Sequence, residues 1–294
     1  MADWREIAAC LRDSGGPQLD PASARPVGGG CIHSAWRIDG SDGACFVKVN
    51  AAGALPQFEA EARGLELLAA AQAVRVPEVI GYAATSSEAF LALEWIELHA
   101  RNADSDRRLG TGLARQHRMT HEAFGLETDN FIGGTPQPNG RQGDWIAFFR
   151  DRRLGFQLAL AAQNGFGDRL DRPGQRLLER LEAFFPGPPP SPSLLHGDLW
   201  GGNAAADAAG RPVIFDPAAY FGDREADLAM ARLFDGFTAA FHSAYQDAWP
   251  LPDGHEARVD LYNLYHVLNH LNLFGAAYLG QARNLLDRLL AAAA

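Results

Sequence analysis

Three polar residues in one short region carry the strongest chemical signal of this chain. In LLHGDLWGGN and the strand-like PVIFD that follows it, Asn203 comes five positions after Asp198, and Asp216 comes eighteen positions after Asp198. Transfer of a phosphoryl group from ATP needs a carboxylate that accepts the proton of the attacking hydroxyl group, and hard oxygen ligands for Mg²⁺. We therefore expect Asp198 to be the catalytic base and Asn203 and Asp216 to bind Mg²⁺.

A second pair of residues, nearer the N-terminus, is suited to holding the nucleotide. Lys48 is the only lysine among the 26 lysine and arginine residues of the chain. Its strand-like segment, FVKVN, suits a lysine that contacts the α- and β-phosphates and is oriented by a glutamate on the next helix. Glu61 is our preferred partner because the helix should turn it toward the sheet. Glu59, about 200° away around the helix, is the alternative.

Two backbone segments complete the predicted nucleotide site. Gly28, Gly29 and Gly30 fall between the first two predicted strands, where the N–H groups of a glycine-rich loop can cover phosphates. The segment from Glu94 to Ile96, where the last predicted strand ends, should offer backbone groups to adenine. A triple glycine, a lone strand lysine or an Asp-Pro step has by itself a plainer explanation as a turn or an edge residue. Their joint order along the chain favours the nucleotide site.

The elements that must position these residues predict an α+β, bilobal, protein-kinase-like fold. Residues 1–96 should form a small antiparallel β-sheet with one inserted helix over 56–73, preceded by a helix over 3–13. Residues 97–294 should form a larger, mostly helical lobe with helices over about 104–123, 144–163, 174–185, 224–249 and 256–291. We expect the ligand site to lie between the two lobes.

The motifs in this order resemble the fructosamine-3-kinase, or ketosamine-3-kinase, family within the aminoglycoside-phosphotransferase and choline-kinase group. The segments that carry the resemblance span most of the chain: GGGCI, FVKVN, FEAEARGLELL, TDNFIGG, HGDLWGGN, IFDPAAYFGDREADLAM and LYNLYHVLNHLNLFG. The Trp-Gly-Gly after Asp198-Leu199 and the GGGC and DNFIG segments separate this family from its relatives. The resemblance implies an active enzyme, because no catalytic position is interrupted.

This resemblance implies ATP-dependent phosphorylation of the 3-hydroxyl group of ketosamines, which are fructosamine, ribulosamine or erythrulosamine adducts on lysine or protein amines. The phosphorylated adduct is unstable and leaves the amine, so the implied process is deglycation, a form of protein repair. ATP and Mg²⁺ are the implied cofactors, and ketosamine small molecules or glycated proteins are the implied partners.

Further residues receive roles that stay open between two readings. Trp200 either stacks on the sugar adduct or is a core tryptophan that covers the catalytic loop. His196 should support that loop, and Asp227 should brace it from the start of a helix. The candidates for the distal substrate wall are equally well explained as a solvated loop or as satisfied core residues: Asp129, Asn130, His266, Asn269 and His270.

Two other functional classes compete with this reading. A small-molecule hydroxyl kinase of the aminoglycoside or choline kinase type would share the same nucleotide residues. A catalytically silent nucleotide-binding protein is disfavoured, because Lys48, Asp198, Asn203 and Asp216 are all present.

Charge and composition narrow the partners. A net charge of −10 argues against a general nucleic-acid or anionic-membrane partner, and no run of 18 apolar residues appears. We expect a cytoplasmic protein, since the N-terminal segment MADWRE is charged and the three cysteines show no metal-ligand spacing. Cys31, beside the triple glycine, is either a redox-active thiol or a small residue filling a strand edge. The protein should be a monomer or a redox-linked dimer.

Overall fold

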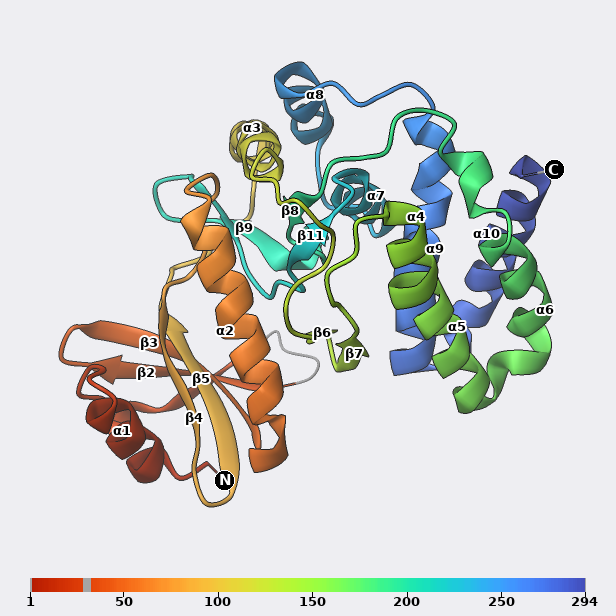
Figure 1. The fold of residues 1–294 in the computed structure, drawn as a ribbon. Helices are drawn as coiled ribbons and strands as arrows, with labels where there is room; N and C mark the ends of the chain where they lie inside the picture. The colour runs from red at the N-terminus through yellow and green to blue at the C-terminus, as the bar shows by residue number, and fades with distance from the viewer. Residues whose placement is uncertain (1, 29–32, 294) are drawn as a thin grey trace.

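The computed structural model describes residues 2–28 and 33–293. Figure 1 shows a sheet flanked by two helices, followed by a larger, mostly helical part that ends far from the sheet. Gly29 and Gly30 of the predicted phosphate loop, and Cys31, the predicted redox residue, lie outside the described residues. Gly28, the remaining glycine of that loop, is exposed.

The sheet is antiparallel and, within the described residues, has five strands in the order β1-β2-β3-β5-β4. The strands are β1 (Arg25–Val27), β2 (Ser34–Gly40), β3 (Gly43–Ala51), β4 (Val79–Ala84) and β5 (Glu88–Glu94). The predicted DGSDG turn joins β2 to β3, and Gly43 there has a φ of 122°, which favours glycine. In the centre of the sheet, Lys48 of β3 pairs with Ala35 of β2 and Leu91 of β5.

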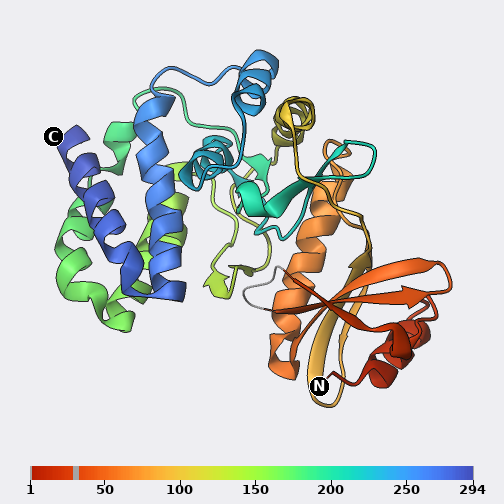
Figure 2. The same ribbon diagram turned by 180° about the vertical axis from the view of Figure 1, so that it is seen from behind.

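Alternation along β3 assigns its side chains to two different helices. Val47 and Val49 pack in a cluster with Ile7 and Leu11 of α1 (Trp4–Asp13). Their neighbours point to the opposite face, which α2 (Leu55–Ala70) covers, and Figure 2 shows the two helices on the two sides of the sheet. Lys48 therefore faces α2.

The second part is built mainly from the remaining α-helices: α3 (Ala103–His117), α4 (Trp145–Phe149), α5 (Gly155–Ala161), α6 (Gly167–Leu178), α7 (Glu225–Leu233), α8 (Ala239–Ala248), α9 (His255–Phe274) and α10 (Leu279–Ala292). Wider π-helical turns over 150–154 and 162–166 join α4 to α5 and α5 to α6. Three short antiparallel pairs lie among these helices: β6 (Asn130–Ile132) with β7 (Thr135–Gln137), β8 (Ser193–Leu195) with β11 (Tyr220–Gly222), and β9 (Ala204–Ala206) with β10 (Pro212–Ile214).

Several predicted helix bounds were wrong, and left-handed backbone explains two of the errors. The predicted helix 224–249 is broken between α7 and α8, where Asp235 and Gly236 have φ values of 55° and 99°. The predicted helix 256–291 is broken at Gly275, whose φ is 85°. None of these three values is compatible with a continuing right-handed helix.

The other errors concern helix ends. The helix predicted over 104–123 ends at His117, and the helix predicted over 174–185 runs from Gly167 to Leu178 and gives way to a 3₁₀ turn over 181–184. The helix predicted over 144–163 is a run of α- and π-helical turns that leads into α6. The short strand pairs after Trp95 were not predicted beyond the PVIFD strand. The lobe boundary at 96–97 stays a prediction.

The sheet and the helical part share one hydrophobic cluster. Phe58 and Leu65 of α2 belong to the same buried cluster as Leu113 of α3 and Leu199 of the catalytic loop. Removing such apolar surface from water contributes about 25 cal/mol per Å². The residues predicted to hold the nucleotide and those predicted to perform the chemistry are thus packed on a common core.

Candidate active site

The lysine–glutamate pair forms across the face between β3 and α2. Lys48 Nζ lies 2.6 Å from Glu61 Oε1, and the side chains are only 9% and 12% exposed. Glu59 lies elsewhere on the helix surface and pairs with Arg63, four residues further along, at 3.8 Å. The helical geometry thus selects Glu61 over Glu59.

The second partner of Lys48 comes from the helical part. Lys48 Nζ donates to Asp216 Oδ1 at 2.8 Å. Asp216 adopts a φ of 56°, and the following Pro217 packs so closely on α2 that a Cβ at Gly64 would meet its Cγ at 3.2 Å. Burial lowers the pKa of Lys48, but Asp216 and Glu61 together outweigh it and raise this pKa. The ammonium group therefore stays charged between two carboxylates.

The catalytic loop, residues 196–203, begins where β8 ends, and a buried aspartate accepts hydrogen bonds from its backbone. Asp227, which is 1% exposed, accepts the backbone N–H groups of His196 at 2.7 Å and Gly197 at 2.9 Å. His117 Nε2 lies 3.1 Å from the same carboxylate. These contacts outweigh burial and lower the pKa of Asp227. Asp227 thus occupies the bracing position predicted for it.

His196 supports the loop and is placed as a structural residue. Its ring is fully buried, with Nε2 3.0 Å from the carbonyl oxygen of Phe215 and Nδ1 3.3 Å from the backbone N–H of Asp198. The Asp198 N–H group makes Nδ1 an acceptor, so Nε2 carries the proton and donates it to Phe215. Burial lowers the pKa of His196, which keeps the ring neutral in this role.

Asp198 has an environment suited to accepting a proton near neutral pH. Burial, followed by the negative charge of Asp216, raises its pKa to about 7, although a hydrogen bond from Asn203 acts in the opposite direction. The Nδ2 atom of Asn203 donates to the carbonyl oxygen of Asp198 at 3.0 Å and to its Oδ2 at 3.2 Å. A general base works best when its pKa lies near the working pH.

The oxygen donors around Asp198 fit a hard cation. Asn203 uses its amide nitrogen on Asp198, which leaves its Oδ1 as the atom able to coordinate, and Asp216 supplies a carboxylate that is 47% exposed. In the described part of the chain, no three His, Cys, Asp or Glu side chains form a cage for a metal. Mg²⁺ is usually bound by one or two carboxylates together with substrate phosphates. The donor set therefore fits Mg²⁺ bound with a nucleotide.

Trp200, two positions after the predicted base Asp198, is an exposed aromatic residue, so it is not a core tryptophan. Its side chain is 38% exposed, and its ring lies over Gly202, where an added Cβ would approach it to 2.3 Å. Phe234 packs against Trp200 at a centroid distance of 6.2 Å, and His270 packs against Phe234 at 4.7 Å. An aromatic strip thus runs from Trp200 through Phe234 to His270.

The other predicted wall residues have their side-chain partners outside this strip, although the backbone carbonyl oxygen of His266 lies 2.8 Å from His270 Nδ1. Asn130 donates to the carbonyl oxygen of Ala219, and Asp129 accepts the N–H group of Asn139, so both hold backbone in place. Asn269 bonds to Gln157. His266 is 3% exposed, and burial lowers its pKa to about 3. Among the wall candidates, His270 is the residue that joins Trp200 through Phe234.

The segment from Glu94 to Ile96 lies at the end of β5, where the sheet passes into the helical part. The Glu94 side chain does not point freely into the site, because its Oε1 lies 2.5 Å from Arg75. Arg75 also contacts Asp207, in the turn between β9 and β10, at 2.5 Å. The predicted contact with adenine therefore rests on the backbone of this segment.

Three neighbours of the site had no role in the sequence interpretation. Arg75 is one arginine among many, and its two carboxylate partners lie far apart in the sequence. Phe234 follows a helix that the periodicity predicted to continue. His33 could have been found from the sequence, because it directly follows the GGGCI segment. In the structure its ring packs on Phe58 at 4.7 Å, and its Nδ1 lies 2.9 Å from Asn50.

Comparison with known proteins places the whole chain beside one group of kinases. The sequence pattern of the fructosamine kinase family matches residues 3–292. A Synechocystis protein named as a probable ketoamine kinase is 43% identical over 98% of this chain and 97% of its own length. A chloroplastic protein-ribulosamine 3-kinase of Oryza sativa subsp. indica is 42% identical over 89% of this chain and 77% of its own length.

Solved structures show the same relationship at the level of the fold. A candidate fructosamine-3-kinase of Haemophilus somnus superposes with a TM-score of 0.88 at 28% identity and covers 98% of this chain and 97% of its own. An aminoglycoside phosphotransferase, APH(4)-Ia, in complex with AMP-PNP and hygromycin B gives a TM-score of 0.65 at 17% identity and covers 99% of both chains. The second likeness shows the bilobal kinase-like fold alone. Among the described residues, no helix combines the length and the apolar character needed to cross a bilayer.

Proposed function

Because this chain belongs to the fructosamine kinase family, we propose that it transfers the γ-phosphate of ATP to the 3-hydroxyl group of ketosamines. The proposed substrates are fructosamine, ribulosamine and erythrulosamine adducts, either free or on protein lysines. The phosphorylated adduct then leaves the amine, so the proposed outcome is deglycation.

One observation carries the catalytic part of this proposal. Asp198, with a pKa of about 7, is held beside Asn203, and Asp216 reaches Lys48 across the two parts of the molecule. A base, a cation for the phosphates and oxygen ligands for a metal are therefore present in one site. This combination supports phosphoryl transfer and argues against a silent nucleotide-binding protein.

The proposed reaction moves one proton and one phosphoryl group. The ionised Asp198 accepts the proton of the 3-hydroxyl group while that oxygen forms a bond to the γ-phosphorus of ATP. The bond between the γ-phosphorus and the β,γ-bridging oxygen breaks, and ADP leaves with the electron pair. Lys48, oriented by Glu61, holds the phosphates of the nucleotide, so much of the rate enhancement comes from positioning and charge stabilisation.

Magnesium is the proposed metal, and Asn203 and Asp216 are its proposed protein ligands. When bound, Mg²⁺ neutralises the phosphate oxygens during the transfer. Asp216 also accepts, through Oδ1, a hydrogen bond from Lys48 at 2.8 Å. Binding of the nucleotide is expected to exchange part of this contact for phosphate contacts.

Trp200 is the proposed platform for the sugar part of the substrate. Its exposed ring lies two residues from the base, and an aromatic face can cover the apolar C–H face of a sugar adduct. His270 and Phe234 extend this surface by ring contacts. The amine-bearing end of the ketosamine is therefore proposed to lie along the strip.

The direct test measures ATP consumption with purified protein against ribulose-lysine, fructose-lysine, erythrulose-lysine, choline and kanamycin. Turnover of the ketosamines and its loss in Asp198→Asn are expected. Turnover of choline or kanamycin alone would refute the proposal in favour of the other small-molecule kinases. Loss of the lysine adduct after phosphorylation, followed by mass spectrometry, tests the deglycation step.

The remaining proposals concern the setting of the enzyme. We keep a cytoplasmic location, a monomer or redox-linked dimer, and the absence of nucleic-acid and membrane partners as predictions. Nonreducing gels before and after peroxide treatment test the dimer: a band that disappears in Cys31→Ser supports it, and a band that persists in this variant contradicts it.

A further inference from the structure

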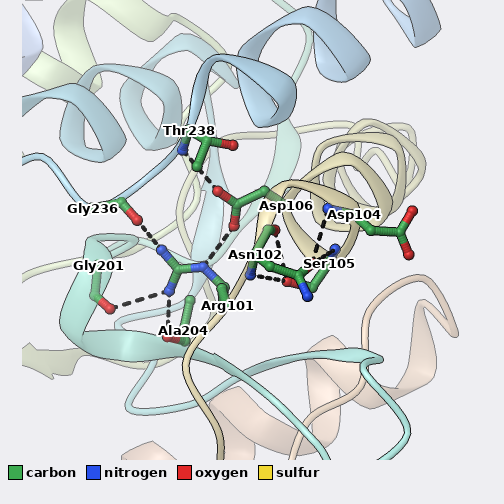
Figure 3. A network of polar contacts seen from close by, with 9 residues as sticks. All are labelled: Arg101, Asn102, Asp104, Ser105, Asp106, Gly201, Ala204, Gly236 and Thr238. Carbon is green, nitrogen blue, oxygen red and sulfur yellow. Dashed lines mark hydrogen bonds and ion pairs between the residues drawn. The ribbon is translucent and has the colours of Figure 1, made fainter.

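An arginine between β5 and α3 gathers separate backbone segments around one guanidinium group. Arg101 donates through Nε to Asp106 Oδ1 at 2.8 Å. Its Nη1 donates to the carbonyl oxygens of Gly201, at 3.2 Å, and of Ala204. Its Nη2 donates to the carbonyl oxygen of Gly236. Figure 3 shows the guanidinium group at the centre of these contacts.

The carboxylate of Asp106 extends the network to the α7–α8 loop, which we define as residues 234–238. Asp106 Oδ2 accepts the backbone N–H of Thr238 at 2.7 Å, and the ring of Phe237 lies 4.4 Å from the guanidinium carbon of Arg101. The side chains of Arg101 and Asp106 are 7% and 1% exposed. The charged pair is thus withdrawn from water. Hydrogen bonds to charged groups are strong in such a buried site.

The two loops that Arg101 joins also touch directly. Gly236 has a φ of +99°, and a Cβ added to it would lie 2.9 Å from the Cα of Gly201. The α7–α8 loop begins with Phe234, whose ring packs against Trp200. The catalytic loop and the α7–α8 loop are therefore packed against each other, and the catalytic loop contains both Trp200 and Asn203.

We propose that Arg101 is a positioning residue that fixes Asn203 for the metal and, through the α7–α8 loop, fixes the aromatic surface at Trp200. The carbonyl groups that it binds, on Gly201 and Ala204, stand on either side of Asn203. The metal and ketosamine parts of this inference rest on the proposed function. The set of contacts around Arg101, which we call the clamp, does not depend on the proposed function.

The chemistry of the side chain explains why an arginine is needed. A guanidinium group offers five N–H donors in a fixed plane, so it can serve a carboxylate and three carbonyl oxygens at once. A lysine at this position keeps the charge but has three donors on a single atom. Arg101→Lys should therefore loosen the loops without removing the positive charge.

A second buried arginine provides a matched control. Arg258 donates to both carboxylate oxygens of Glu225, at 2.7 and 2.8 Å, and to the carbonyl oxygen of Phe184 at 3.0 Å. Its guanidinium carbon lies 5.6 Å from the ring of Phe185. Arg258→Lys thus perturbs a comparable buried ion pair, carbonyl contact and ring contact, but between α9 and the first residue of α7.

The experiment compares Arg101→Lys and Arg258→Lys by hydrogen–deuterium exchange and by Mg²⁺ titration of the binding of a fluorescent ADP analogue. Arg101→Lys should increase exchange in residues 199–206 and 234–238 together. It should also raise the Mg²⁺ concentration needed for half-maximal nucleotide binding by about 10-fold, because replacing a residue that supports a metal ligand commonly weakens metal binding to this extent. Arg258→Lys should leave both quantities at the wild-type values.

Unchanged exchange and an unchanged Mg²⁺ requirement in Arg101→Lys would overturn the inference, and so would equal changes in Arg258→Lys. Should Arg101→Lys fail to fold, Asp106→Asn decides by the same two measurements. The asparagine keeps the side-chain shape, but its NH₂ group faces a donor, either Arg101 or the N–H of Thr238, and cannot accept from it. Neither measurement requires turnover. A wild-type protein that phosphorylates no ketosamine would thus refute the proposed function while the clamp is still tested.

Discussion

The Nζ atom of Lys48 lies 2.8 Å from Oδ1 of Asp216, a residue 168 positions further along the chain. This hydrogen bond joins the centre of the sheet to the segment that follows the catalytic loop. The same ammonium group is held by Glu61 at 2.6 Å. The cation proposed for the phosphates and the carboxylate proposed for the metal are thus in direct contact with each other.

Replacement of Lys48 by arginine should lower kcat by about 10²-fold or more, because a planar guanidinium group does not fit between the two carboxylates and contacts phosphates differently. The thermal midpoint should change little if the charge is retained. Steady-state kinetics and differential scanning fluorimetry measure the two effects. The reverse exchange at a surface pair, Arg63→Lys, is the control and should leave kcat unchanged; near-normal turnover in Lys48→Arg would contradict the proposed role.

Replacement of Asp198 by asparagine should lower kcat by about 10³-fold, in the range of general-base contributions, and should stabilise the protein at neutral pH. The folded-state pKa of Asp198, about 7, lies above the ordinary value of 3.8 for an aspartate. Ionisation of the folded protein is thus unfavourable, and the stability contributed by the protonated form is lost as the pH rises through 7.

The gain for Asp198→Asn is expected above pH 7 and should vanish below pH 4. A gain of about 1 kcal/mol corresponds to about 2–4 °C in Tm for a domain of this size class. Thermal melts at pH 4 and pH 8 check the sign. A lower Tm at pH 8 would show that the carboxylate stabilises the fold.

The pH dependence of kcat/KM for MgATP should report Asp198 in the free enzyme. Its pKa of about 7 arises from burial and from Asp216, and the base works only when ionised, so kcat/KM should rise up to about pH 7 and then level off. The hydrogen bond from Asn203 lowers this pKa. Asn203→Ala should therefore move the midpoint to higher pH, whereas a wild-type midpoint below pH 5 would argue against a raised pKa.

Removal of the Trp200 ring should raise KM for ketosamines by about 10-fold, equivalent to about 1.4 kcal/mol, with a smaller effect on KM for ATP. Trp200→Phe should retain most of the affinity, because it keeps an aromatic face. Trp4→Ala, in the N-terminal helix, is the control. Equal effects of Trp200→Ala on both KM values would assign the ring to general support of the loop.

A methyl group at Gly197 should disrupt the catalytic loop. Gly197 has a φ of +83°, and an added Cβ would lie 2.0 Å from the carbonyl oxygen of Ala218. Gly210 has a similar φ of +72° but has nothing within 4 Å of the added atom. Gly210→Ala therefore suffers the backbone strain alone, about 1–2 kcal/mol, whereas Gly197→Ala should also lose activity and considerably more stability. Chemical denaturation and kinetics of both variants separate the two causes.

The sequence was most informative where chemistry and periodicity coincide. The 3.6-residue repeat of the helix favoured Glu61 over Glu59 without deciding between them, and the structure shows Glu61 on Lys48. Chain breaks were harder to predict: Asp235 and Gly236 adopt left-handed backbone inside an otherwise helical pattern. Arg101 was beyond reach, because its partners are mostly backbone carbonyl groups up to 135 positions away, and carbonyl groups carry no sequence signature.

The burial of Lys48 also makes the chain a natural reporter of its own unfolding. Lys48 is the only lysine in the sequence. It is 7% exposed, and its pKa is raised. Acylating reagents attack the neutral, accessible form of an amine, so the folded protein should protect this position and the unfolded chain should expose it. The fraction of molecules acylated at Lys48, measured by mass spectrometry, would then report the fraction of unfolded molecules without any engineered probe.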